Sequence, residues 1–327
     1  MKTPSAPHWL GRNSVPLMMQ RVLLALLPFY VTSTFFFGLG VLSNALLLIV
    51  FCCLAEALAL AARGRDIRGG LQDYSAVVAA LLIAPCLPPG TTWWVLAVAA
   101  VFAILLAKHV YGGLGHNVFN PAMAGYVAVL IAFPQHVAEW PAMAASADGI
   151  SDAIVDASTG ATPLDTVKMQ LGQMRTMTEI TATEQFGLLA GYGWEWMNLT
   201  ALAGGLWLLR KGVMSWHAPG AMLLTMGLLY FGFYAFSPAT QPSPVLGLLS
   251  GGTMLAAFFI VTDPVSGAAT PLGRIIFGAG TGALCFAMRA WGAYPDGIAF
   301  AVLFMNMCAP LLDRYTLPRI YGHRKRP

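Results

Sequence analysis

The stretch GVLSNALLLIVFCCLAEALALAA occupies residues 40–62 and decides the class of fold. It exceeds the roughly 20 apolar residues that an α-helix needs to cross the hydrocarbon core of a bilayer. The whole chain shares this character, because 57% of its 327 residues are hydrophobic and only 10% are charged. Soluble domains carry about 25% charged residues. We therefore predict an all-α integral membrane protein.

Ten hydrophobic stretches divide the chain, which predicts about ten transmembrane helices. The first five spans and the last five form two membrane halves, residues 1–135 and 198–327, joined by one long external loop, residues 136–197. Since the two halves enter the membrane from opposite faces, the layout is typical of two inverted five-helix repeats, although no residue-level self-similarity accompanies it. The predicted spans are 22–38, 40–62, 74–90, 92–109, 118–135, 198–210, 218–236, 245–261, 275–291 and 297–312. The sixth is short, and an earlier start around Phe186 is the alternative for it.

The basic residues predict the orientation of these spans. Lysine and arginine gather in cytoplasmic loops, and all but three of the 18 fall on one side of the predicted layout. Lys108 is placed among these loop residues. Both termini are then cytoplasmic and the acidic loop 136–197 lies outside. The net charge of +4 follows from this topology and gives no reason to expect nucleic acid as a partner. The three exceptions are Lys168, Arg175 and Arg289.

The external loop contains the sequence DASTGATPLD at residues 156–165. One interpretation is a helix N-terminus, with Thr162 before the helix, Pro163 in its first position and Asp165 placed much as in a capping box. A second interpretation, compatible with the first, concerns chemistry. An N-cap hydroxyl lies against free helix N–H groups, where a phosphate would be stabilised.

The same stretch resembles the acceptor signature for covalent attachment of FMN, Asp-x-x-Thr-Gly-Ala-Thr. In that signature the last threonine, here Thr162, carries the flavin through a phosphoester. Asp156 and Thr159 complete the motif, and the small residues Gly160 and Ala161 leave room for a modifying enzyme to approach the backbone.

Polar residues inside other hydrophobic segments are candidates for an ion pathway. Glu56 is the one acidic residue well within a span, and it either belongs to a pathway or forms a structural pair with Arg289. The run GGLGHNVFNPA at residues 112–122 either lines a site with Asn117 and Asn120 or is a tight turn in which Asn120 caps the next helix.

A second polar run, TDPVSGAATPLGR at residues 262–274, contains Asp263. It is similar to the acceptor motif, but Ser-Gly-Ala-Ala-Thr at 266–270 is one residue longer than Thr-Gly-Ala-Thr. We therefore interpret it as a structured loop that contacts a flavin or another subunit. The five cysteines form no C-x-x-C pair, and no metal ligands or catalytic residues are predicted.

Taken together, these motifs give the chain a family resemblance. It resembles the family of the D subunit of the Rnf electron-transport complex and the related B subunit of Na⁺-translocating NADH:quinone oxidoreductase. The resemblance rests on Gly-His-Asn-x-x-Asn-Pro-Ala at 115–122, Thr-Gly-Ala-Thr at 159–162 and Thr-Asp-Pro-x-Ser-Gly at 262–267. The first span begins after about twenty residues, which favours the Rnf branch of the family.

The resemblance implies a membrane subunit of a ferredoxin:NAD oxidoreductase that moves Na⁺ or H⁺ across the inner membrane. FMN would be attached from FAD to Thr162 at the periplasmic face by a flavin transferase, and it would exchange electrons with a second covalent flavin on the G subunit. The resemblance to the B subunit of the quinone oxidoreductase also implies a non-covalent riboflavin within the membrane. The partners would be membrane lipid and the A, B, C, E and G subunits. This subunit would not be catalytic alone, because no Gly-x-Gly-x-x-Gly for NAD is present.

Two other classes of function compete with this one. A solute channel or secondary transporter would use broken helices as a central site, and an inverted repeat suits it equally well. A purely structural scaffold leaves Glu56 and the acceptor motif unexplained. The external loop discriminates between them, because a channel needs no acceptor threonine.

Overall fold

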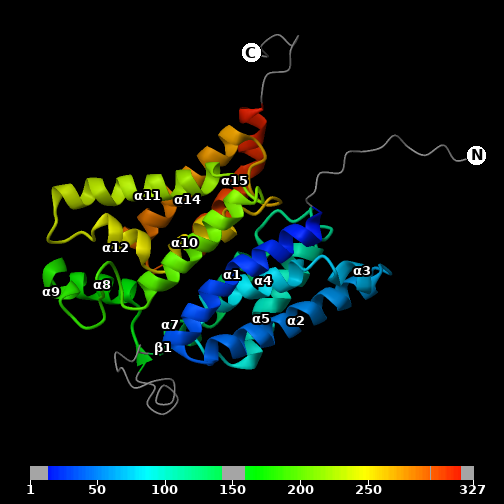
Figure 1. Cartoon of the computed structure of the whole chain (residues 1–327), viewed down its shortest axis with the longest axis horizontal. Coiled ribbons are helices and arrows are strands. Elements are labelled where there is room, and N and C mark those ends of the chain that lie inside the picture. The colour runs from blue at the N-terminus through cyan, green and yellow to red at the C-terminus, as the bar shows by residue number, and fades with distance from the viewer. Residues whose placement is uncertain (1–13, 142–158, 295, 318–327) are drawn as a thin grey trace, which may run out of the picture.

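A computed structural model describes residues 14–141, 159–294 and 296–317, and helices dominate it (Figure 1). Each of the ten predicted spans coincides with helical structure. The first half contains α1 (Val15–Phe37), α2 (Gly40–Ala62), α3 (Ile67–Leu71), α4 (Ser75–Ile83), η1 (Ala84–Cys86), α5 (Trp93–Ala100), the π-helix η2 (Val101–His109) and α6 (Pro121–Ala132).

The segment between the two halves is only partly helical in its described residues. It contains α7 (Pro134–Ala138), β1 (Trp140–Pro141), β2 (Thr159–Gly160), α8 (Pro163–Gly172) and α9 (Met177–Thr181). The second half contains α10 (Trp194–Arg210), α11 (His217–Phe236), α12 (Pro244–Leu249), α13 (Thr253–Leu255), the π-helix η4 (Ala256–Ile260), α14 (Pro271–Trp291) and α15 (Ile298–Thr316).

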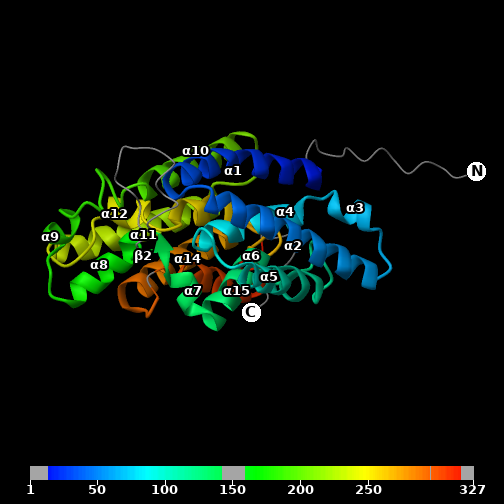
Figure 2. The same ribbon diagram turned by 90° about the horizontal axis from the view of Figure 1, so that it is seen from below.

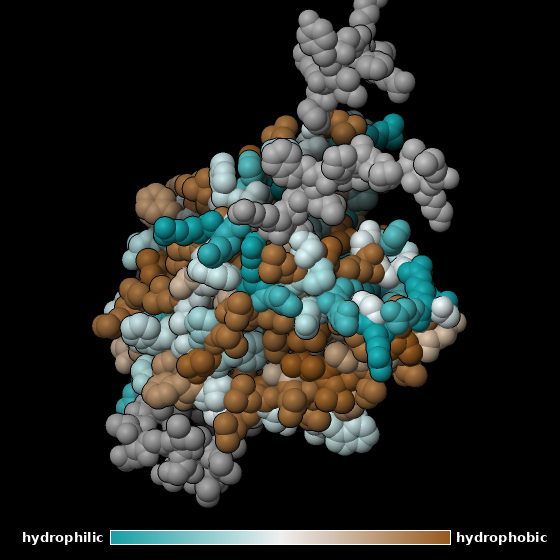
Figure 3. Space-filling model, turned by 45° about the vertical axis from the view of Figure 1, so that its right-hand side comes forward, coloured by the Kyte–Doolittle hydropathy of each residue, from teal (hydrophilic) through white to brown (hydrophobic). Residues whose placement is uncertain are grey.

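The prediction of an all-α membrane protein is confirmed, whereas the exact number of spans stays a prediction. Among the described residues, α1, α2, α11, α14 and α15 are long and apolar enough to cross a bilayer. Shorter apolar helices cover Ser75–Cys86, Trp93–His109 and Pro121–Ala132. Figure 3 shows apolar side chains over much of one face. Lipid is the natural neighbour of exposed residues such as Leu27, Val31 and Phe35 on α1.

Several predicted segments differ from the structure in their limits. α1 begins at Val15, seven residues before the predicted start, with a proline in its first turn. α10 begins at Trp194 and not at residue 198. The eighth predicted span is broken between α12 and α13, because Ser250 is extended and Gly251 adopts a left-handed φ of 60°.

The two halves meet through corresponding helices. α1 packs on α10, the first span of each half, and α6 packs on α15, the last span of each half (Figure 2). Gly204 of α10 permits this closeness, because a Cβ there would lie 2.3 Å from the Ala25 carbonyl oxygen of α1. Small residues let membrane helices approach in this way. A pseudo-twofold relation would produce the same pairing, and the inverted repeat itself stays a prediction.

Candidate functional site

The segment before Thr162 is held in place by backbone pairing with the stretch that follows α7. β1 and β2 run antiparallel, with Trp140 opposite Gly160 and Pro141 opposite Thr159. The chain then turns at Ala161, whose surface is exposed. Asp156, the first residue of the predicted motif, lies outside the described residues.

Thr162 caps α8, as the sequence predicts. Its backbone is extended, with φ −62° and ψ 157°, and its side-chain oxygen accepts a hydrogen bond from the Asp165 backbone N–H at 3.2 Å. The Thr162 hydroxyl donates in turn to Asp165 Oδ2 at 2.5 Å. The Gln185 amide donates to the Ala161 carbonyl at 3.3 Å and so ties the turn to the segment before α10.

Three aromatic rings from distant parts of the chain gather beside Thr162. The Trp140 and Trp194 ring centroids are 5.3 Å apart, and the Phe37 ring lies 5.5 Å from Trp140 and 5.6 Å from Trp194. Each ring belongs to a different element, namely α1, β1 and α10. Such a cluster offers flat apolar surfaces to a planar conjugated ligand.

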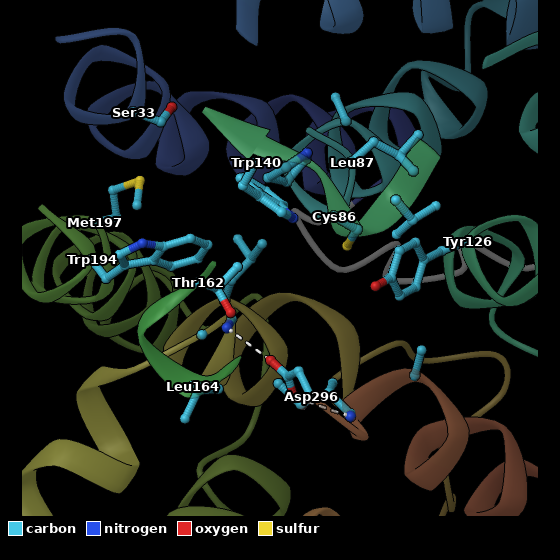
Figure 4. Close-up of a pocket in the computed structure, with 18 of the residues that line it drawn as sticks. Ser33, Cys86, Leu87, Tyr126, Trp140, Thr162, Leu164, Trp194, Met197 and Asp296 are labelled. Carbon is cyan, nitrogen blue, oxygen red and sulfur yellow. Dashed lines mark hydrogen bonds between the residues drawn. The ribbon is translucent and has the colours of Figure 1, made fainter. Parts of the chain in front are cut away.

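Two hollows meet at these aromatic residues. The larger has a volume of about 250 Å³ and lies between the membrane halves, with mostly apolar walls that include Cys86, Tyr126 and Asn198. The smaller, about 230 Å³, continues past Ala161 and Tyr192. Thr162 borders both hollows. Figure 4 shows it between Trp194 and Asp296, with Trp140 above.

Two carboxylates face the larger hollow. Asp165 and Asp296 both line it, and burial is the main cause that raises the pKa of Asp165 above its usual value of 3.8. The charge on Asp296 raises this pKa further, whereas hydrogen bonds from Thr162 lower it. Lys168 anchors α8 through hydrogen bonds to the Gly292 carbonyl and, at 3.2 Å, to the Tyr294 carbonyl.

Asp296 also stabilises the break in the eighth predicted span. It accepts from the Gly252 backbone N–H at 3.3 Å and pairs with Arg289 at 3.2 Å. Arg289 donates to the Gly247 carbonyl at 2.8 Å and to Thr253 Oγ1 at 3.0 Å. The suggested pairing of Arg289 with Glu56 is therefore wrong, because its partners are the backbone groups that the break frees and a nearer carboxylate.

Glu56 lies in a separate buried cluster. Lys108 Nζ is 2.6 Å from Glu56 Oε2 and 2.8 Å from Ser75 Oγ. His109 Nε2 is 3.0 Å from the other Glu56 oxygen, within ion-pair distance although the ring forms no hydrogen bond. The predicted placement of Lys108 in a loop is therefore corrected: this residue is 2% exposed at the end of η2. Its charge is held there by the carboxylate of Glu56.

Asn120 and Asp263 belong to a third cluster, which joins the two halves. The Asn306 side chain accepts from the Asn120 backbone N–H at 2.9 Å and donates to the Ser266 carbonyl at 3.0 Å. Ser266 Oγ donates to Asp263 Oδ2 at 2.6 Å. Asn120 also caps α6 through the Met123 N–H, which confirms the capping interpretation.

Asn117 lies apart from these contacts. Its amide donates to the Phe119 carbonyl two residues later, at 3.0 Å, and so stabilises the turn before α6. The structure therefore separates the predicted site residues into the Thr162 site and two buried clusters. No local sequence signal pointed to Trp140, Trp194, Asp296 or Asn306, because the contacts that bring each of them to its site include residues far away in the chain.

Comparison with known proteins agrees with this helical membrane fold. The model of the NQR2, RnfD, RnfE family matches residues 2–322. Proteins named as the D subunit of an ion-translocating oxidoreductase complex are similar over almost the whole chain. One from Ectopseudomonas mendocina is 47% identical, covering 98% of this chain and 96% of its own, and one from Vibrio atlanticus is 44% identical, covering 98% of each. The chain belongs to the NQR2, RnfD, RnfE family.

Proposed function

We propose that this protein is a membrane subunit of an ion-translocating oxidoreductase complex and that it carries FMN covalently on Thr162. The curated relatives are named as such a subunit, and the chain is similar to them over nearly their full length. The observation that carries the flavin assignment is the position of the Thr162 hydroxyl. It lies at a helix N-terminus, beside three aromatic rings, where two hollows meet.

The residues around Thr162 fit such a group. The first-turn N–H groups of α8 and the positive end of its dipole suit a phosphoester. Trp140, Trp194 and Phe37 suit the flat ring system, and the largely apolar hollow shields it from water. Bound FMN would supply reversible electron transfer. The chain's own contribution is to fix the point of attachment, to pack the ring and to place Asp165 and Asp296 near it.

The finer assignment follows the family resemblance. We infer that the complex transfers electrons between reduced ferredoxin and NAD and couples this transfer to Na⁺ or H⁺ movement across the inner membrane. Thr162 then faces the periplasm, with both termini in the cytoplasm, and the G subunit carries the next flavin. In support, Figure 1 places α8 and α9 at the opposite end of the molecule from α3. The A, B, C and E subunits and a flavin transferase are the remaining partners.

The same proposal includes a non-covalent riboflavin and a coupled ion, but it assigns them less specifically than it assigns FMN. Asn120 and Asp263 lie between the halves, where a non-covalent riboflavin would contact both. Their hydrogen bonds, however, are with other protein groups. Glu56 is held by Lys108, so an ion could use this carboxylate only if Lys108 moved away.

The proposed function is tested by the intact mass of the protein, co-expressed with its flavin transferase and denatured to remove loose ligands. We expect an added mass equal to one phosphoester-linked FMN on the peptide that contains Thr162. Thr162→Val should abolish attachment, because the hydroxyl is lost, while removal of the N-cap costs only about 1 kcal/mol. Thr162→Ser, which keeps the hydroxyl, is the matched control and should retain FMN. An unmodified wild-type mass, with the transferase active on another acceptor, would refute the assignment.

A secondary transporter is the second candidate, and one observation favours it. The η1 turn and the break at residues 250–252 both border the larger hollow, and interrupted helices often form transport sites. The same mass measurement discriminates the two functions, since a transporter has no reason to carry a flavin on Thr162.

A further inference from the structure

Two threonine caps in this protein bond to acidic residues in different ways. Thr176 caps α9 and forms a reciprocal capping box with Glu179, whose carboxylate accepts from the Thr176 backbone N–H at 3.0 Å. Thr162 caps α8 with Asp165 at the same spacing, but here the carboxylate accepts from the threonine hydroxyl at 2.5 Å. Capping itself requires only that the hydroxyl oxygen accept a hydrogen bond. The Thr162 hydroxyl therefore makes a second hydrogen bond, to a carboxylate, that capping does not require.

The hydrogen bond between Thr162 and Asp165 has the length of a charge-assisted O–H···O⁻ bond. Asp165 is half-buried at the edge of the larger hollow, and burial raises its pKa. A carboxylate with a raised pKa is a better proton acceptor near neutral pH. Thr162 is half-buried and borders both hollows, so its side chain can be approached from them while its hydroxyl donates to Asp165.

We infer that Asp165 is a catalytic residue for its own protein's modification and takes the proton of Thr162 Oγ1 when the flavin is attached. This inference rests on the proposed function. In the reaction, a bond forms between Thr162 Oγ1 and the flavin-side phosphorus of FAD. The pyrophosphate P–O bond breaks, AMP leaves, and the hydroxyl proton passes to Asp165 Oδ2. No electrons are transferred, and the flavin transferase supplies the FAD.

The experiment measures the rate of attachment in the full chain. Protein purified in detergent from cells that lack the transferase is mixed with transferase, Mg²⁺ and FAD, and covalent flavin is followed by in-gel fluorescence and intact mass. We expect Asp165→Asn to lower the rate roughly 10²–10⁴-fold, the usual contribution of a general base. Glu179→Gln removes a negative charge from the corresponding cap position of α9, which is exposed and lines neither hollow, and it is the matched control with an unchanged rate.

The pH profile distinguishes a proton acceptor from a merely structural residue. Only ionised Asp165 can accept the proton, so the wild-type rate should fall as the pH is lowered through the raised pKa of this carboxyl group. Asp165→Asn should lack this acidic limb, whereas Glu179→Gln, assayed with the same transferase, should retain it. Thermal unfolding of each variant in detergent reports on the fold independently.

Asp165→Glu provides a second variant, because it keeps the carboxylate but alters the cap. A rate well above that of Asp165→Asn supports the inference. Equal rates in Asp165→Asn and the wild type, or equally slow rates in the Asn and Glu variants, would overturn it and leave Asp165 a capping residue. Absence of FMN from the wild type, with an active transferase, would instead refute the proposed function.

Discussion

The polar groups near the two ends of α2 are organised in contrasting ways. Near Val41, at the start of α2, the Thr162 site borders two hollows, from which its side chain can be approached. Toward the other end, Glu56 is 3% exposed and is closed in by Lys108 and His109. Neither hollow is lined by that cluster. Buried polar groups that satisfy one another stabilise a fold, whereas polar groups beside an apolar hollow are available to a ligand.

The largest effect on stability is expected at Glu56. Glu56→Gln leaves the buried ammonium group of Lys108 without its counter-charge, which should lower the free energy of unfolding by about 3–5 kcal/mol. Glu56→Gln combined with Lys108→Met removes both charges and should recover most of this loss. Unfolding in mixed micelles with increasing sodium dodecyl sulfate measures both changes.

The Glu56 variants also test the contrast between the two ends of α2. Folded Glu56→Gln protein should still acquire covalent FMN, because Thr162 is unaltered. Loss of attachment in that folded protein would show that the two regions are coupled and not independent.

A smaller effect is expected between the halves at Asn306. Asn306→Leu leaves the Asn120 backbone N–H and the Ser266 carbonyl without their side-chain partner, and this should cost roughly 1–3 kcal/mol. Met307→Leu changes the next residue, which is 63% exposed, and serves as the control. The same micelle titration applies. Equal stability of the two variants would contradict the view that the Asn306 side chain holds the two halves together.

The effect on stability at the aromatic cluster is expected to be no larger than that at Asn306. Trp194→Leu removes ring contacts with Phe37 and Trp140, each worth about 0.5–1.5 kcal/mol. Attachment should persist, but flavin fluorescence should increase because a stacking tryptophan no longer quenches it. Trp216→Leu, at an exposed position beyond the opposite end of α10, is the control. Unchanged fluorescence in Trp194→Leu would place the flavin ring outside the cluster.

Local patterns predicted the elements well. The apolar stretch at 40–62 matches α2 residue for residue, and the caps at Thr162 and Asn120 are where the Thr-Pro and Asn-Pro pairs indicated. Hydrophobic length and cap chemistry depend on neighbours within a few residues, so the sequence carries them directly. The break after α12 was missed, because Ser250 and Gly251 lie within an otherwise apolar run.

Charge pairing could not be predicted in the same way. In the sequence, Lys108 was counted among the loop residues that indicate the orientation of the spans, and Arg289 was one possible partner for Glu56. The structure pairs Lys108 with Glu56 and Arg289 with Asp296. An isolated ionisable residue within a span indicates that a partner is needed, but helix packing selects that partner.

The sequence by itself determined the membrane class and the family, and it singled out Thr162 as the hydroxyl to which we propose that FMN is attached, because each of these depends on residues that are contiguous in the chain. Only the tertiary structure decided what surrounds that hydroxyl. Phe37, Trp140 and Trp194 meet because α1 packs on α10 and β1 pairs with β2. Asp296 reaches the same hollow from the start of the last span. Contacts between residues more than a hundred positions apart leave no local pattern, and they form only when the two halves close on each other.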